Sequence, residues 1–358
     1  MRHRGGSLLL SGALAWLSAA GAQQPPPKGP MLPAINPALA RPDQTATTKL
    51  DGPGLGVTWS EEVGLLLAAC EGQSLHYWHK DVAMGIRVGD NTVHVLKGHA
   101  APVTAVVAAG TTFASAGADG KVLVWRLPDD RILHTLNAGG VVRALAVAPG
   151  GKMLASAGDD GTLQLWDPAT GKPGTKLTGP TDWQLALAFS PDGKTLAAGG
   201  YDGKLRVWDV AGGKRTLKVE ALPPLPANTP KDAPLRSANV VSALAYSPDG
   251  KTIALGGSEA AIHLFQAADG KLMRSLPGHT SSVSALVFHP SGTLLVSASK
   301  DRTLRLWNPA TGQMIKALEG HTAWVQGVAF MAQGTRLASV GADQTVRLWD
   351  LTDPNAKK

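Results

Sequence analysis

The sequence predicts an all-β fold, a seven-bladed β-propeller of four-stranded antiparallel blades, from three observations. The aromatic residues are 10 Trp against 3 Tyr and 5 Phe, a skew that indicates a positional role for tryptophan. One aromatic residue recurs mostly every 41 or 42 residues, at Trp78, Trp125, Trp166, Trp208, Phe265, Trp307 and Trp349. Each interval holds four short apolar stretches separated by turn residues, and such a unit is typical of a propeller blade.

Composition excludes several classes of site. The chain of 358 residues is 44% hydrophobic, which suffices for a core, and it has one cysteine, Cys70. A single cysteine excludes an intrachain disulfide, a Cys-x-x-Cys zinc ribbon, an iron–sulfur cluster and a c-type haem site. Because Cys70 ends the apolar run 65–70, we expect a buried core thiol. We expect no nucleic-acid partner, because the net charge of +7 is dispersed without clustered basic and aromatic residues.

The first 22 residues have the layout of a secretory signal peptide. Arg2 and Arg4 give a positive start, residues 7–20 are apolar, and small residues lead to a cleavage site before Gln23. The apolar run is shorter than the roughly 20 residues that a membrane-spanning helix needs. We therefore expect an exported protein, periplasmic or extracellular, without a transmembrane segment.

The rest of the chain divides into three parts. Residues 23–46 hold seven prolines and are expected to form an extended Pro-rich linker. The repeats occupy residues 47–351 as one propeller domain, and residues 352–358 form a C-terminal tail.

The sixth repeat shows how each unit is built. Strands are expected at 283–288, 294–297, 303–307 and 314–318. Turn residues such as Pro290 and Gly292 separate them, where the chain needs a fixed or a positive φ. The last repeat stops after its third strand, whereas residues 47–50 match a fourth strand. We therefore expect the N-terminal strand to pair with the blade that ends at Trp349 and to close the ring, which removes exposed sheet edges.

The repeats carry a family resemblance. Gly-His pairs open units at His99, His279 and His321, and Trp-Asp pairs end units at Trp166, Trp208 and Trp349. This pattern resembles WD-repeat β-propellers over residues 47–351. The resemblance implies a rigid platform for protein or peptide partners, which would bind on the face that carries the loops before strand one and between strands two and three.

Three blades contain a Ser-His-Asp combination that could suggest a hydrolase. The sets are His99, Ser115, Asp119 and Trp125; His279, Ser297, Asp301 and Trp307; and His321, Ser339, Asp343 and Trp349. A hydrolase would use His to take the Ser proton and Asp to orient the His. An enzyme needs one such site, and here the set occurs three times. The resemblance implies structural tetrads that link neighbouring strands by hydrogen bonds, so no catalytic residue, cofactor or metal site is expected.

The other blades depart from this pattern. Blade 3 keeps Ser156 and Asp160 without the His, blade 4 has Ala198 in place of the Ser, blade 5 has Glu259 and Phe265, and blade 1 keeps only its Trp. We expect these blades to be the less stable ones. His76 and His79 flank Trp78 in a strand and are expected to make a poor metal-ligand pair.

The long spacing before Phe265 indicates an insertion at 221–237, expected to overhang the channel mouth on the face of the Gly-His loops. The candidate partner-binding residues on that face are Arg143, Trp183, Tyr201, Lys300, Trp324 and Gln326. Tryptophan, tyrosine and arginine dominate binding hot spots. Two alternatives stay open. Trp183 and Trp324 could pack only against neighbouring blades, and the central channel could serve a small-ligand sensor or a propeller enzyme. We expect a monomer in the absence of the partner.

Overall fold

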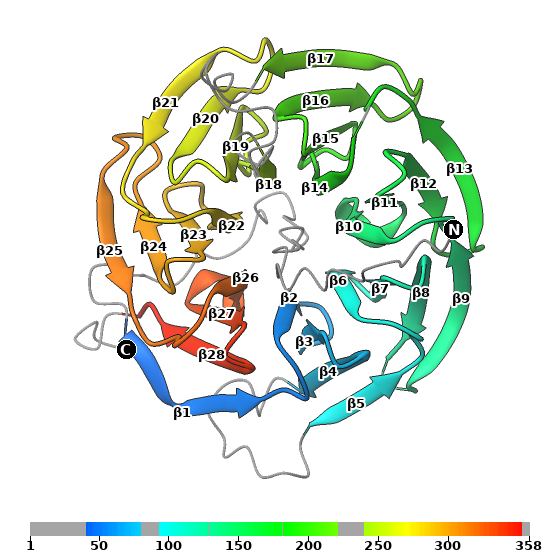
Figure 1. The fold of residues 1–358 in the computed structure, drawn as a ribbon, viewed down its shortest axis with the longest axis horizontal. Helices are drawn as coiled ribbons and strands as arrows, with labels where there is room; N and C mark the ends of the chain where they lie inside the picture. The colour runs from blue at the N-terminus through cyan, green and yellow to red at the C-terminus, as the bar shows by residue number, and fades with distance from the viewer. Residues whose placement is uncertain (1–40, 80–92, 128, 181, 221–239, 353–358) are drawn as a thin grey trace, which may run out of the picture.

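The computed structural model describes residues 41–79, 93–127, 129–180, 182–220 and 240–352. Seven four-stranded antiparallel sheets stand in a ring around a central axis, as predicted (Figure 1). The expected signal peptide, the insertion at 221–237, the tail beyond Thr352 and most of the expected linker lie outside the described residues.

The strands follow the chain from the inside of each blade to its rim. Blade 1 consists of β2 (Gly54–Ser60), β3 (Leu65–Cys70), β4 (Ser74–His79) and β5 (His94–Lys97). Blade 2 consists of β6 (Val103–Ala109), β7 (Thr112–Gly117), β8 (Lys121–Arg126) and β9 (Arg131–Asn137). Blade 3 consists of β10 (Val142–Val147), β11 (Leu154–Gly158), β12 (Leu163–Asp167) and β13 (Lys172–Leu177). Blade 4 consists of β14 (Gln184–Phe189), β15 (Thr195–Gly200), β16 (Lys204–Asp209) and β17 (Arg215–Glu220).

Blades 5 and 6 have the same order, whereas in blade 7 the N-terminal strand takes the rim position. Blade 5 consists of β18 (Val241–Tyr246), β19 (Thr252–Gly257), β20 (Ile262–Gln266) and β21 (Leu272–Leu276). Blade 6 consists of β22 (Val283–Phe288), β23 (Leu295–Ser299), β24 (Leu304–Trp307) and β25 (Met314–Leu318). Blade 7 consists of β26 (Val325–Met331), β27 (Arg336–Gly341), β28 (Thr345–Asp350) and β1 (Arg41–Lys49). Two short 3-10 helices, η3 (Pro149–Gly151) and η5 (Ala332–Gly334), follow β10 and β26.

The ring closes as the sequence predicts. Strand β1 pairs antiparallel with β28, and Thr47, Thr48 and Lys49 lie opposite residues 347, 346 and 345. The pairing extends further than expected, because β1 begins at Arg41, inside the stretch assigned to the linker. A register shift separates Pro42 from Thr47. In Figure 1 this strand lies at the rim of blade 7, beside strands from the other end of the chain.

Burial falls from the channel side of each blade to its rim. Strands β2, β6 and β22 are buried at every residue, whereas β21 is exposed at four of its five residues. Neighbouring blades cover both faces of the inner strands, and these strands are mostly apolar, without a regular alternation of polar residues. The recurring tryptophans pack in this core, and Trp208, Trp307 and Trp349 are almost fully buried. The periodic aromatic residue is therefore a core residue.

Each inner strand begins with a β-bulge, a position where the pairing with the second strand shifts by one residue. Three of the bulge residues join neighbouring blades. The hydroxyls of Thr104 and Ser242 donate to the backbone carbonyls of Val142 and Val283, at 2.7 and 2.8 Å. Ser284 donates in the same way to the next blade. These three bulges thus form hydrogen-bonded seams between the inner strands of neighbouring blades.

Candidate functional site

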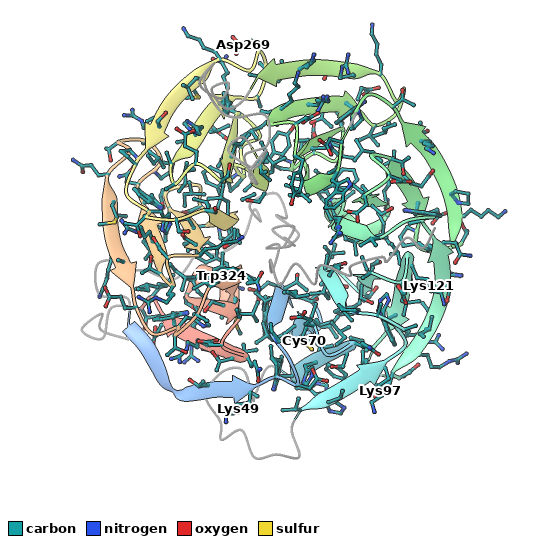
Figure 2. All side chains as sticks on the ribbon, viewed as in Figure 1. Lys49, Cys70, Lys97, Lys121, Asp269 and Trp324 are labelled. Atoms are coloured by element: carbon teal, nitrogen blue, oxygen red, sulfur yellow. The ribbon has the colours of Figure 1, made fainter. Side chains whose placement is uncertain are left out.

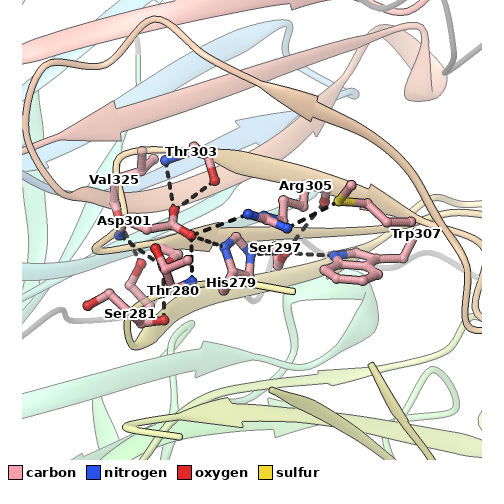
Figure 3. A network of polar contacts seen from close by, with 12 residues as sticks. His279, Thr280, Ser281, Ser297, Asp301, Thr303, Arg305, Trp307 and Val325 are labelled. Carbon is pink, nitrogen blue, oxygen red and sulfur yellow. Dashed lines mark hydrogen bonds and ion pairs between the residues drawn. The ribbon is translucent and has the colours of Figure 1, made fainter. Parts of the chain in front are cut away.

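Blade 6 shows the geometry of a complete tetrad (Figure 3). His279 Nδ1 lies 2.7 Å from Asp301 Oδ2, and His279 Nε2 lies 2.6 Å from Ser297 Oγ. Trp307 Nε1 donates to the same Ser297 oxygen at 2.8 Å. The four side chains come from the loop before the first strand, the second strand, the turn after it and the third strand. The tetrad therefore ties the inner three strands of the blade together.

Blades 2 and 7 repeat this geometry. In blade 2, His99 lies 2.9 Å from Ser115 Oγ and 3.0 Å from Asp119 Oδ1. In blade 7, His321 lies 2.7 Å from Ser339 Oγ and 2.9 Å from Asp343 Oδ2. Trp125 and Trp349 donate to these serines at 2.8 and 2.9 Å. The structure brings together all twelve residues predicted to form tetrads.

One protonation pattern satisfies every polar atom of a tetrad. Burial lowers the pKa of His279, against the opposing effect of Asp301, so the imidazole is neutral at pH 7. Its Nδ1–H then donates to Asp301, and its Nε2 accepts the proton of Ser297. Burial alone would raise the pKa of Asp301, but hydrogen bonds from His279 and Thr303 hold this pKa well below its usual range. The chain of donors and acceptors is complete, as buried polar groups require.

The serine of each tetrad is closed to a substrate. Ser115, Ser297 and Ser339 are all 0% exposed. Each hydroxyl oxygen also accepts the indole N–H of its tryptophan, so the atoms of a hydrolytic triad are present without access to their nucleophile. This arrangement can stabilise a sheet, and in this structure it offers no surface for acyl transfer.

The incomplete blades use other partners. Trp166 still donates to Ser156 at 2.8 Å, but Asp160 contacts only Thr162 among the hydrogen bonds of the described residues. In blade 4 the Trp208 indole donates to the backbone carbonyl of Thr178 at 3.2 Å. In blade 5 His263 lies 3.0 Å from Glu259. That these blades are less stable stays a prediction.

A repeated hydrogen bond joins the two sets of loops on which partner binding is expected. The residue after the second strand donates its backbone N–H to the residue before the first strand in all seven blades. The pairs are Glu71–Pro53, Ala118–Pro102, Asp159–Val141, Tyr201–Trp183, Ser258–Val240, Lys300–Ser282 and Ala342–Trp324. These loops therefore lie together on one face, called here the Gly-His face.

On the Gly-His face, blades 3 and 4 bring four polar and aromatic side chains together. The Arg143 guanidinium lies 5.1 Å from the centre of the Trp183 ring and forms a bidentate ion pair with Asp159. Trp183 and Tyr201 meet edge to face with ring centres 5.2 Å apart. Their side chains are half-buried. The cluster combines an aromatic surface with a fixed charge pair.

Blades 6 and 7 form a second contact of the same kind. Lys300 Nζ lies 4.7 Å from the centre of the Trp324 ring. Burial lowers the pKa of Lys300. As in the first cluster, a cation from one blade covers the half-buried tryptophan of the next blade. Figure 2 shows Trp324 at the inner end of blade 7, beside the channel. Both tryptophans thus contact a neighbouring blade and are half-buried.

Gln326 is a correction to the set of candidate residues. Its side chain is 0% exposed, so it does not reach the surface of the Gly-His face in this structure. Residue 326 lies in the bulge at the start of β26, at the position of Thr104 and Ser284 in blades 2 and 6, and all three side chains are buried. Arg143 occupies the same position in blade 3 and reaches the Trp183 ring. Nothing in the spacing of the sequence reveals a bulge.

Blade 1 contains a polar cluster that the sequence analysis did not bring together. Asp51 Oδ1 lies 2.7 Å from Cys70 Sγ and 3.2 Å from His76 Nε2, and Ser74 Oγ lies 3.0 Å from His76 Nε2. Cys70 is buried, as expected. Burial, together with Asp51, raises the pKa of Cys70 to about 11, so the thiol donates to the Asp51 carboxylate. The repeat pattern does not indicate Asp51, because this residue lies in the loop that follows β1.

The family "WD domain, G-beta repeat" matches residues 90–126, 130–167, 171–209, 270–308 and 312–350, more than half of the chain. The chain belongs to this WD-repeat family. Blades 1 and 5, which carry the least regular repeats, lie largely outside the matched residues but have the same four strands. Comparison with curated proteins gave no match. The described residues contain no helix long and apolar enough to cross a membrane.

Proposed function

We propose that the protein is a non-catalytic interaction scaffold that works outside the cytoplasm and binds a protein or peptide on its Gly-His face. The family to which the chain belongs commonly serves protein interaction. The observation that carries the proposal for this face is the pair of half-buried tryptophans, Trp183 and Trp324, each beside a cation from the preceding blade.

The chemistry of the face suits a protein surface. Tryptophan, tyrosine and arginine combine a large contact area with a polar group, and they supply most hot spots of interfaces. Arg143, Trp183 and Tyr201 are fixed by one another, so little side-chain entropy is lost when a partner binds. The cluster at Lys300 and Trp324 supplies a second anchor on the same face.

Two further parts of the proposal rest on separate arguments. The buried serines of the three tetrads support a role without catalysis, because they assign the Ser-His-Asp sets to blade stability. The location outside the cytoplasm rests on the signal-peptide layout of residues 1–22. The scaffold is proposed to be monomeric before its partner binds.

The experiment identifies the partner and maps the face at once. Cells that export the protein are treated with a crosslinker, and crosslinked partners are identified by mass spectrometry for the native chain and for Trp183→Ala, Tyr201→Ala and Trp324→Ala. Loss of a hot spot of about 2 kcal/mol weakens binding roughly 30-fold. We expect the partner to disappear in these variants and to remain in the control Met273→Ala, a residue 57% exposed on the rim strand β21. Retention of the partner in all three variants would exclude this face.

A further inference from the structure

We propose that Asp51, Cys70 and His76 form a binding site in blade 1 for a divalent cation of the zinc class. The three side chains offer a carboxylate oxygen, a sulfur and an imidazole nitrogen, all within 4.8 Å of one another. Within the described ranges no other group of three such ligands comes together. Sulfur and imidazole ligands favour zinc over magnesium or calcium, and aspartate is a common third ligand.

The distances between the donor atoms are close to those of a tetrahedral site. Asp51 Oδ1 is 2.7 Å from Cys70 Sγ and 3.2 Å from His76 Nε2, and Ser74 Oγ is 3.3 Å from Cys70 Sγ. With zinc–ligand bonds of about 2.0–2.3 Å, tetrahedral ligand atoms lie about 3.3–3.7 Å apart. All three ligand atoms lie within 4.8 Å of one another, so movements on the order of 1 Å convert the hydrogen-bonded cluster into a coordination shell.

The cluster is rigid on one side and open on the other. Cys70 ends β3 and His76 lies in β4, the strand paired with it, so the backbone of a buried sheet fixes both ligands. The Asp51 side chain is 43% exposed, so a cation can enter from solvent at this ligand. Ser74 or a water molecule can fill the fourth position. On binding, the cation replaces the thiol proton, a sulfur–metal bond forms, and the proton passes to solvent.

The site exists because blade 1 lacks the tetrad. Gly72 stands six residues before Trp78, where the complete blades have aspartate, and Leu50 stands where they have histidine. A Cβ atom at Gly72 would lie 2.5 Å from Asp51 Oδ1, so the Asp51 carboxylate fills the space beside that turn. In blade 2, a Cβ atom at Gly117 would lie 2.4 Å from His99 Nδ1. Cys70 stands at the equivalent position of blade 1, where blade 6 has Ser299 beside its tetrad.

The position of the site gives the cation a structural consequence. Asp51 lies two residues after Lys49, the end of the ring-closing strand β1, whereas Cys70 and His76 belong to blade 1. Figure 2 shows Cys70 inside blade 1 and Lys49 near the end of β1. A bound cation thus links the closing segment of blade 7 to the next blade, and it is expected to raise the melting temperature.

The test uses Co²⁺ as a spectroscopic probe and Zn²⁺ as a competitor on the purified protein. We expect one equivalent of Co²⁺ to give a sulfur-to-cobalt charge-transfer band with the visible bands of tetrahedral coordination, and Zn²⁺ to abolish both. Cys70→Ser should lose the charge-transfer band and bind Zn²⁺ at least about 100-fold more weakly, since even residues behind metal ligands contribute 10–100-fold. Zn²⁺ should raise the melting temperature of the native chain and leave that of Cys70→Ser unchanged.

Two further variants keep the test decisive. Asp51→Asn changes a half-exposed residue without altering its size, so it should fold even where a core variant does not, and it should bind Co²⁺ at least about tenfold more weakly. His263→Gln is the matched control, because His263 stands two residues before Phe265 as His76 stands two before Trp78, and it contacts Glu259 and Ser275. It should leave the bands intact. Absence of a charge-transfer band in the native chain, or its persistence in Cys70→Ser, would overturn the proposal.

Discussion

Blades 6 and 1 share one backbone and differ in the polar chemistry inside it. In blade 6, His279, Ser297 and Trp307 form a closed set of hydrogen bonds. In blade 1, Ala68 stands at the serine position, and the buried Trp78 Nε1 has no hydrogen-bond partner among the described residues. The four strands form in both blades. The tetrad therefore adds stability to a blade whose form comes from apolar packing against its neighbours, and a blade without a tetrad has room for another polar cluster.

The largest expected effect concerns the junction between blades 7 and 1. Deleting residues 23–52 removes β1 and the buried Leu50 and exposes the edge of β28. The free energy of unfolding should therefore fall by at least about 4 kcal/mol, or the protein should fail to fold. Deleting residues 23–40 leaves β1 intact and serves as the control. Thermal unfolding of both truncations checks the effect. Equal melting temperatures would show that β1 does not close the ring.

The next effect measures what a tetrad contributes. Asp301→Ala removes the acceptor of His279 and should lower the free energy of unfolding by about 1–3 kcal/mol. The control is Asp160→Ala in blade 3, where the turn aspartate is exposed and no histidine is present, and its effect should stay within about 0.5 kcal/mol. Urea unfolding of the two variants gives the difference. Equal losses would remove the distinction between complete and incomplete blades.

A third prediction compares the space beside the second strand in blades 2 and 1. Gly117→Ala places a methyl group 2.4 Å from His99 Nδ1 and 2.6 Å from Asp119 Oδ1, so the tetrad must move, at a cost of about 1–3 kcal/mol. Cys70→Ala causes no such clash, because cysteine already has a Cβ at this position. Measured with a chelator present, it should lower the free energy of unfolding by about 1 kcal/mol, because the hydrogen bond to Asp51 is lost. A larger loss for Cys70→Ala than for Gly117→Ala would contradict the steric account.

The smallest expected effect is a gradual one with pH. Burial lowers the pKa values of His99 and His279, so below about pH 6.5 the unfolded chain binds more protons than the folded chain, and stability falls on acidification. Below pH 3.8 the lowered pKa values of Asp301 and Asp343 add a further loss with the same sign. Urea midpoints at pH 7, 5.5 and 4 should decrease in that order. His279→Asn should flatten the first part of this slope, and a midpoint that rises towards pH 5.5 would refute the assignment.

Strand positions were predictable because the apolar runs are local. The expected strand at 283–288 coincides with β22, and the one at 314–318 coincides with β25. The start of β1 at Arg41 was missed because the sequence from 41 to 46 has no apolar alternation, and the edge of β28 supplies its pairing. Blade 5 was recovered through Phe265, which replaces tryptophan in the same core position.

The site was less predictable, because it depends on contacts between distant residues. The tetrads could be inferred from their triple occurrence at constant spacing. The burial of Gln326 depends on a bulge, and the cluster around Cys70 depends on the path of the loop after β1, which carries Asp51 over Gly72. Such features arise from backbone geometry that a single sequence does not encode in any short pattern.

The groups that stabilise the blades are distinct from the surface proposed to bind a partner, and one measurement tests that separation directly. Partner capture from crosslinked cells is measured together with thermal unfolding for the double variant Trp183→Ala/Trp324→Ala and for Asp301→Ala. The account predicts that the double variant loses the partner at a nearly native melting temperature, whereas Asp301→Ala melts earlier and, while folded, keeps the partner. Full capture by the double variant, or loss of capture by folded Asp301→Ala, would contradict it.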